Sequence, residues 1–144
     1  MKILLLLALT MAFGLLQTHG DLLDFRKMIR LMTGKEAVSG YAFYGCYCGF
    51  GGRGFPKDST DWCCARHDCC YTLLEKQGCG TKFVGYEFTY QNGQIICAKQ
   101  DRCKRELCLC DKTAAICFAR NLNTYNKAYQ YYNNWGCSSR KSMC

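Results

Sequence analysis

Long apolar runs, glycosylation sequons and histidines are all scarce in this sequence of 144 residues. After the first residues, no apolar run reaches the roughly 20 residues that a membrane-spanning helix needs. No Asn-x-Ser/Thr sequon occurs, so N-linked glycosylation is not expected. The histidines are His19 and His67 alone. Chemistry that needs an imidazole must therefore use one of these two side chains.

The N-terminus predicts a secretory signal peptide. One lysine is followed by an apolar run that ends near Leu16, and small residues up to Gly20 suit cleavage there. A membrane anchor is the alternative, but the uninterrupted run is short for one. We therefore expect residues 1–20 to be removed and residues 21–144 to form one small, secreted, extracellular domain. His67 is then its sole histidine.

The cysteines predict a disulfide framework. All 14 lie beyond the expected cleavage site, and an even number in a small secreted chain indicates seven disulfides. The adjacent pairs Cys63-Cys64 and Cys69-Cys70 argue against a zinc site, where spaced ligands are usual. Spacing alone leaves the pairing open.

Basic residues outnumber acidic ones, and they are scattered along the chain. The formal charge is +8, or +7 once Lys2 is removed with the signal peptide. Scattered charge favours anionic membranes or sulfated glycans such as heparan sulfate over a particular base sequence. No nucleic-acid-binding motif is present, so no nucleic-acid partner is expected. The alternative interpretation is that the positive charge serves only to keep the protein soluble. We also expect the protein to be a monomer.

Hydrophobic periodicity and turn residues predict a mainly helical domain. The expected elements, in order, are an amphipathic helix over about 22–32, a turn-rich loop over 41–54, a helix entered at 56–61 and ending near Lys76, a β-hairpin over 81–97 with its turn at Asn92-Gly93, a second long helix over about 100–121, and an irregular tail over 122–144 stapled back by late cysteines.

The loop over 41–54 is rich in glycine, with five glycines between Gly45 and Gly54. Such a loop can turn several backbone carbonyls inward, which a hard cation such as calcium requires. It contains no acid and lacks the patterns of a phosphate-binding P-loop and of an EF-hand. A calcium site here would need a carboxylate from elsewhere, and a purely structural turn is an equal alternative.

The stretch 61–71 concentrates the reactive side chains. On a helix, His67 shares a face with Cys63 and Cys70, two possible covalent anchors, and the next residue is an acid. A lone histidine is more often structural, but these neighbours favour a general base. Such a base needs an orienting carboxylate. Asp111, among apolar neighbours in the second long helix, is the candidate.

Three runs of sequence, taken together, resemble the secreted phospholipases A2. They are YGCYCGFGG at 44–52, CCARHDCCY at 63–71 and CLCD at 108–111. The likeness covers essentially the whole chain after the signal peptide. The extended tail that ends in Cys144 resembles the group II enzymes. The signal peptide and the excess of basic over acidic residues are similar to those of the mammalian group IIA enzymes. The resemblance implies a mainly α, disulfide-rich fold. Two long antiparallel helices would be cross-linked by disulfides, beside an N-terminal helix, a calcium loop and a small hairpin.

The same resemblance implies calcium-dependent hydrolysis of the sn-2 ester of glycerophospholipids, which releases fatty acid and lysophospholipid. His67 would deprotonate a water that attacks the ester directly, without an acyl-enzyme, and Asp111 would orient His67. Tyr71 and Tyr86 match tyrosines that hydrogen-bond Asp111. Lys82 is expected near the substrate phosphate.

The implied calcium ligands are the Asp68 carboxylate and the backbone carbonyls of Tyr47, Gly49 and Gly51. The N–H of Gly49 would also stabilise the oxyanion. With one carboxylate among neutral carbonyls, we expect weak binding, on the order of 10⁻⁴–10⁻³ M, which suits extracellular calcium.

Because the substrate lies in a membrane, the protein must bind one peripherally. Leu22, Leu23 and Phe50 are the expected apolar contacts, with core packing as the alternative for each. The basic residues favour anionic membranes, such as those of bacteria, and so an antimicrobial role. A non-catalytic protein on the same fold, which binds a receptor, heparan sulfate or membranes, is the alternative. The presence of His67, Asp68 and Asp111 together favours the enzyme.

Seven disulfide pairings are also implied by the resemblance: Cys46–Cys137, Cys48–Cys64, Cys63–Cys117, Cys69–Cys144, Cys70–Cys110, Cys79–Cys103 and Cys97–Cys108. The residue numbers of 63–117 and of 70–110 have the same sum, which is the register of two antiparallel helices. That register puts Asp111 about 3 Å along the axis from the position opposite His67.

Overall fold

A computed structural model describes residues 22–50, 52–140 and 144. The predicted signal peptide, residues 1–20, and the predicted calcium ligand Gly51 lie outside the described residues. Within the described ranges, no helix combines the length and the apolar character needed to cross a bilayer.

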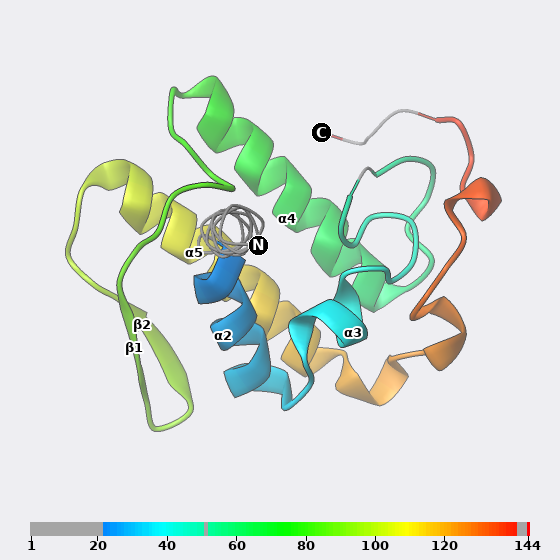
Figure 1. The fold of residues 1–144 in the computed structure, drawn as a ribbon, viewed down its shortest axis with the longest axis horizontal. Coiled ribbons are helices and arrows are strands. Elements are labelled where there is room, and N and C mark those ends of the chain that lie inside the picture. Colours follow the sequence, from blue (N-terminus) through cyan, green and yellow to red (C-terminus); the bar gives the residue numbers. More distant parts are fainter. Residues whose placement is uncertain (1–21, 51, 141–143) are drawn as a thin grey trace, which may run out of the picture.

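Two long helices, α4 (Ser59–Lys76) and α5 (Arg102–Arg120), form the frame of the molecule. They lie against each other and run in opposite directions (Figure 1). Each begins at an aspartate that accepts a backbone N–H from three residues ahead: Asp58 caps α4 and Asp101 caps α5. The expected pair of antiparallel helices is confirmed, with ends within a few residues of those predicted.

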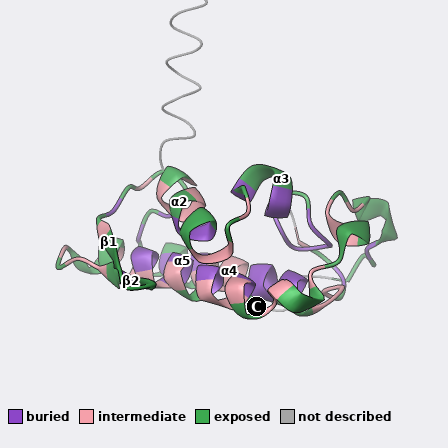
Figure 2. Ribbon diagram, turned by 90° about the horizontal axis from the view of Figure 1, so that it is seen from below, coloured by how far each residue is buried: buried purple, intermediate pink, exposed green. Residues whose placement is uncertain are grey.

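The shorter helices α2 (Leu22–Thr33) and α3 (Ala37–Tyr41) lie on one side of the α4–α5 layer (Figure 2). The predicted amphipathic helix is α2, which buries Met28 and Ile29. Helix α3 leaves no signal in the sequence, because one helical turn is too short to show a periodic pattern.

The core consists of two clusters of buried side chains that share α5. Ala114 and Phe118 belong to the cluster that includes α3 and the glycine loop. Leu107 and Ala115 belong to the cluster that includes Met28 of α2. The small side chains of the two alanines, both fully or almost fully buried, let the neighbouring elements pack closely on α5.

The hairpin consists of β1 (Phe88–Gln91) and β2 (Gln94–Cys97), paired antiparallel. Its turn is the predicted Asn92-Gly93, with φ of 50° and 76°, as a two-residue hairpin turn requires. The predicted hairpin began too early. The N–H of Tyr86 donates to the Asp24 carboxylate of α2 instead of to a neighbouring strand, so the ladder starts only at Phe88.

All seven predicted disulfide pairings are confirmed. Cys63–Cys117 and Cys70–Cys110 join α4 to α5 at the predicted register. The tail contains three short 3-10 turns, η1 (Leu122–Thr124), η2 (Lys127–Tyr129) and η3 (Asn134–Gly136). The bonds Cys46–Cys137 and Cys69–Cys144 fasten it to the glycine loop and to α4.

Candidate active site

His67 of α4 and Asp111 of α5 form a hydrogen-bonded pair between the two long helices. His67 Nε2 lies 2.6 Å from Asp111 Oδ1, and the side chains are 11% and 1% exposed. A carboxylate can only accept a hydrogen bond, so Nε2 carries the proton. Nδ1 then keeps its lone pair, and it makes no hydrogen bond within the described part of the chain. The histidine is thus held in the tautomer of a general base.

Two buried tyrosines hold the Asp111 carboxylate. The hydroxyl of Tyr71 donates to Oδ1 and that of Tyr86 to Oδ2, each at 2.6 Å. Burial raises the pKa of both tyrosines above the usual range, and the charge of Asp111 raises it further. Both hydroxyls therefore remain donors. Together with His67, they give the buried carboxylate three charge-assisted hydrogen bonds.

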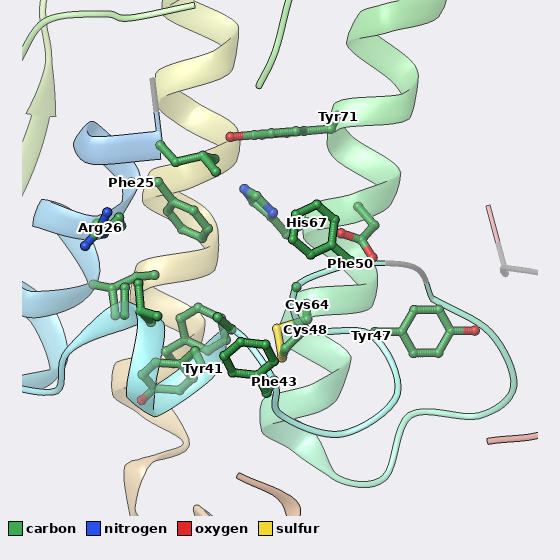
Figure 3. Close-up of a pocket in the computed structure, with 18 of the residues that line it drawn as sticks. Phe25, Arg26, Tyr41, Phe43, Tyr47, Cys48, Phe50, Cys64, His67 and Tyr71 are labelled. Atoms are coloured by element: carbon green, nitrogen blue, oxygen red, sulfur yellow. A yellow bond between two sulfur atoms is a disulfide. The ribbon is translucent and has the colours of Figure 1, made fainter. Parts of the chain in front are cut away.

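The imidazole also packs against aromatic rings, as Figure 3 shows. Phe25 of α2 stacks on His67 with ring centroids 4.3 Å apart and an interplanar angle of 17°. The Tyr71 ring lies at the same centroid distance but tilted. The helical pattern of residues 22–32 predicts an apolar face but not that Phe25 on it touches His67, because such a pattern does not say which distant side chain a residue will contact.

The glycine loop is fixed by Asp61, a role that the sequence of the helix entry does not reveal. Asp61 is fully buried and accepts the backbone N–H groups of Cys46, Tyr47 and Lys57 at 2.7–2.8 Å. Gly45 has φ of +60°, and a Cβ there would overlap the Asp61 carboxylate. The loop can therefore close on this aspartate only with glycine at position 45.

Asp68 points a carboxylate oxygen into this region without a partner. Its Oδ2 is buried and makes no hydrogen bond among the described residues. Burial raises the pKa of Asp68 to about 7, and the positive charge of Lys82 opposes that rise while Asp61 adds to it. A buried carboxylate oxygen without a partner is unusual in a native protein and fits the ligand of a cation.

Two of the other predicted ligands are the backbone carbonyls of Tyr47 and Gly49. No hydrogen bond to the carbonyls of Tyr47 and Gly49 forms among the described residues. In that part of the chain no cluster of three His, Cys, Asp or Glu side chains could hold a metal. One carboxylate together with backbone carbonyls would form a donor set of oxygens, which suits calcium.

A pocket of about 240 Å³ opens beside these residues, and both His67 and Asp68 line it. Its walls are mostly apolar side chains of α2, α3, the glycine loop and α5, among them Phe25, Ile29, Tyr41, Tyr47 and Phe118.

The predicted membrane contacts and Lys82 lie differently around this pocket. Leu22, Phe50 and Lys82 line it, and Phe50 is 89% exposed. Leu23 is exposed but does not line the pocket. Leu22, Phe50 and Lys82 thus line the same pocket as His67 and Asp68, whereas Leu23 does not and Gly51 lies outside the described residues.

The fold and the pocket define a disulfide-linked helical scaffold that holds a histidine–aspartate pair near the glycine loop. The phospholipase A2 family model matches residues 22–130. The human protein "Phospholipase A2, membrane associated" is 62% identical over 144 residues, the full length of both chains. The bovine protein of the same name is 61% identical over the same span.

Snake proteins are similar as well. "Basic phospholipase A2 B" of Gloydius halys is 58% identical over 130 residues, which cover 90% of this chain and 93% of the snake chain. The chain belongs to the phospholipase A2 family, as the resemblance predicted.

Proposed function

We propose that this chain is a secreted, calcium-dependent phospholipase A2 that hydrolyses the sn-2 ester of glycerophospholipids at membrane surfaces. The observation that carries the proposal is the pairing of His67 with Asp111 at the wall of an apolar pocket that Asp68 also lines. A general base, an oxygen site for a cation and an apolar cavity together fit metal-assisted hydrolysis of a lipid ester.

His67 acts as the general base. Its Nδ1 takes a proton from a water, and the hydroxide that forms attacks the ester carbonyl. Asp111 stabilises the imidazolium through the bond to Nε2 and keeps the ring oriented. When the intermediate collapses, the proton returns from Nδ1 to the leaving lysophospholipid oxygen. All cysteines of the described ranges are in disulfides, so no thiol competes with water as the nucleophile.

The Asp68 carboxylate and the carbonyls of Tyr47, Gly49 and Gly51 are the proposed calcium ligands, and the Gly49 N–H supports the oxyanion. Calcium supplies positive charge that polarises the ester carbonyl and attracts the phosphate. Its binding should be weak, on the order of 10⁻⁴–10⁻³ M, because a single carboxylate contributes charge.

Side chains in and beside the pocket contact the lipid. Phe50, with Leu22 and Leu23, inserts among the acyl chains, and Lys82 attracts the phosphate of the substrate. The formal charge of +7 that remains once Lys2 is removed with the signal peptide favours anionic membranes, such as those of bacteria. The protein acts as a monomer bound peripherally, because one chain carries every residue of the proposed site.

The test uses phosphatidylglycerol vesicles with different acyl chains at the sn-1 and sn-2 positions. In millimolar calcium, mass spectrometry should detect release of the sn-2 chain only, and chelation should abolish it. Release that persists in chelator contradicts the role of calcium. The absence of any release by correctly oxidised protein contradicts the proposed activity.

A cationic binding function is the second candidate, and the excess of scattered basic residues favours it. In that case the protein binds heparan sulfate, a receptor or bacterial envelopes without hydrolysis. His67→Gln separates the two functions. Bacterial killing that is lost in this variant follows from hydrolysis, and killing that survives follows from binding.

A further inference from the structure

We propose that the C-terminal tail positions the calcium loop, and that Phe55 and Arg140 are the positioning residues of this contact. The inference rests on the proposed function, because it concerns the same calcium site. In Figure 1 the last part of the chain runs beside the loop that connects α3 to α4.

Three contacts join the end of the loop to the tail. Arg53 Nη2 donates to the carbonyl of Asn134 at 3.0 Å, and the N–H of Gly54 donates to the carbonyl of Arg140 at 2.9 Å. The guanidinium of Arg140 lies over the Phe55 ring, 4.9 Å from its centroid. Three successive loop residues are therefore held by a segment more than 80 positions away in the sequence.

The same loop residues contact the proposed ligands from the other side. The Gly54 carbonyl accepts the hydroxyl of Tyr47 at 2.5 Å. Gly52 lies so close to the Tyr47 ring and to Asp68 that a Cβ would meet both, with Asp68 Oδ2 at 3.2 Å. A shift of the tail would therefore move Gly54, and with it the Tyr47 side chain whose backbone carbonyl is a proposed ligand.

Two disulfides set where the tail lies. Cys46–Cys137 joins it to the residue before Tyr47, and Cys69–Cys144 joins its end to the residue after Asp68. Two of the proposed ligands, Tyr47 and Asp68, thus each have a tail disulfide on a neighbouring residue. Between these anchors, the contacts of Arg53, Phe55 and Arg140 hold the loop. All three side chains are exposed, so their loss should leave the buried core intact.

A loop that is held in its binding conformation binds a cation more tightly, because less conformational freedom is lost on binding. The sign of the effect is informative for Arg140. Burial raises the pKa of Tyr47, and the nearby positive charge of Arg140 opposes that rise. By electrostatics alone, removing this charge would strengthen calcium binding. The positioning role predicts weaker binding instead.

The experiment measures calcium affinity by titrating CaCl₂ into the oxidised chain and following backbone amide NMR shifts of the loop, so it does not depend on activity. Phe55→Ala removes the cation–π contact without changing charge, and should raise the Kd for calcium roughly two- to fivefold. Arg140→Ala should also raise it. The double variant should be no weaker than the worse single variant, because both substitutions remove one contact.

Matched variants complete the design. Phe55→Trp and Arg140→Lys keep an aromatic ring and a cation, and should restore most of the affinity. Lys104→Ala removes one exposed charge from the start of α5, where the side chain makes no hydrogen bond or ion pair among the described residues, and should leave the Kd unchanged. Arg53→Ala tests a different contact between the loop and the tail. It should weaken calcium binding, because the hydrogen bond to the Asn134 carbonyl is lost.

The outcomes separate this inference from the proposed function. Normal calcium binding by the unsubstituted chain, with an unchanged Kd in Phe55→Ala and Arg53→Ala, overturns the tail's positioning role alone. Tighter calcium binding by Arg140→Ala overturns the positioning role as well. So does a lower melting temperature of the loop and tail variants without a change in their Kd for calcium. Absence of calcium binding by the unsubstituted chain overturns the proposed calcium site and this inference with it.

Discussion

His67 and Asp111 are 44 positions apart in the sequence, yet Nε2 and Oδ1 lie 2.6 Å apart. Two disulfides between the same helices bracket this contact. Cys63–Cys117 lies on one side of it and Cys70–Cys110 on the other. His67 and Asp111 therefore belong to one covalently fixed unit of two helices.

The first prediction concerns Asp111. Asp111→Asn keeps the volume of the side chain but offers His67 an amide in place of a carboxylate, so the imidazolium loses its counter-charge. We expect kcat to fall by at least about 100-fold, which is the scale of general-base catalysis. Calcium affinity should not fall comparably. Steady-state kinetics with vesicles measure kcat, and a calcium titration measures the affinity. A comparable loss of calcium affinity would contradict the separation of the His67–Asp111 pair from the metal site.

The second prediction concerns pH and calcium. In the metal-free chain, burial raises the pKa of Asp68 from 3.8 to about 7. A raised carboxyl pKa means that the folded state holds the proton more tightly. This group's contribution to stability is therefore greatest at low pH and is lost as the pH rises from about 4 to about 7.

Calcium must displace that proton, so its affinity should weaken by up to about tenfold per pH unit below the pKa. Calcium should accordingly raise the melting temperature more at pH 8 than at pH 5. Thermal unfolding followed by circular dichroism, with calcium and with chelator, gives the comparison. An equal calcium-induced shift at both values would show that Asp68 is not the ligand.

The third prediction concerns Asp61. Its two oxygens accept three backbone N–H groups, so Asp61→Asn turns an amide donor toward an N–H donor. We expect a loss of about 1–3 kcal/mol in the free energy of unfolding, together with weaker calcium binding. Denaturant unfolding measures the first effect. Asp101→Asn is the matched control, because asparagine caps a helix as well as aspartate does. Equal stabilities of the two variants would contradict the role of Asp61.

The fourth prediction concerns Phe50. Its ring is 89% exposed at the pocket opening. Phe50→Ser should lower partitioning to phosphatidylglycerol vesicles by about tenfold or more, because inserting a phenylalanine is worth about 1.5–3 kcal/mol. Hydrolysis of a soluble short-chain lipid should be nearly unchanged. Ile96→Ser, on the exposed face of β2 and away from the pocket lining, is the control. An equal loss of partitioning in both variants would contradict a specific membrane contact at Phe50.

Much of the helical frame could be predicted from sequence, because its signals are local. The caps before α4, the Asn92-Gly93 turn and the periodicity of α2 each lie within a few residues. The cysteine spacing alone could not give the pairing, which came from the resemblance. Once Cys63–Cys117 and Cys70–Cys110 were assumed, helix geometry placed Asp111 beside His67.

The parts that sequence could not give depend on contacts between distant residues. Phe25 stacks on His67, and Asp61 holds the glycine loop, but neither contact leaves a pattern in the sequence. The contact of Arg53 with Asn134 spans 81 positions. Such contacts are set by how the loops and the tail pack on the frame, and single-residue propensities do not encode that packing.

The most direct test of the account replaces the histidine itself. His67→Gln and the control Arg66→Gln change neighbouring residues of α4. The Arg66 side chain is exposed and makes no hydrogen bond or ion pair within the described ranges. Release of the sn-2 fatty acid from phosphatidylglycerol vesicles in calcium should fall by at least about 100-fold in His67→Gln and remain near the unsubstituted rate in Arg66→Gln. Hydrolysis that persists in a folded His67→Gln variant would contradict the assignment of His67 as the general base.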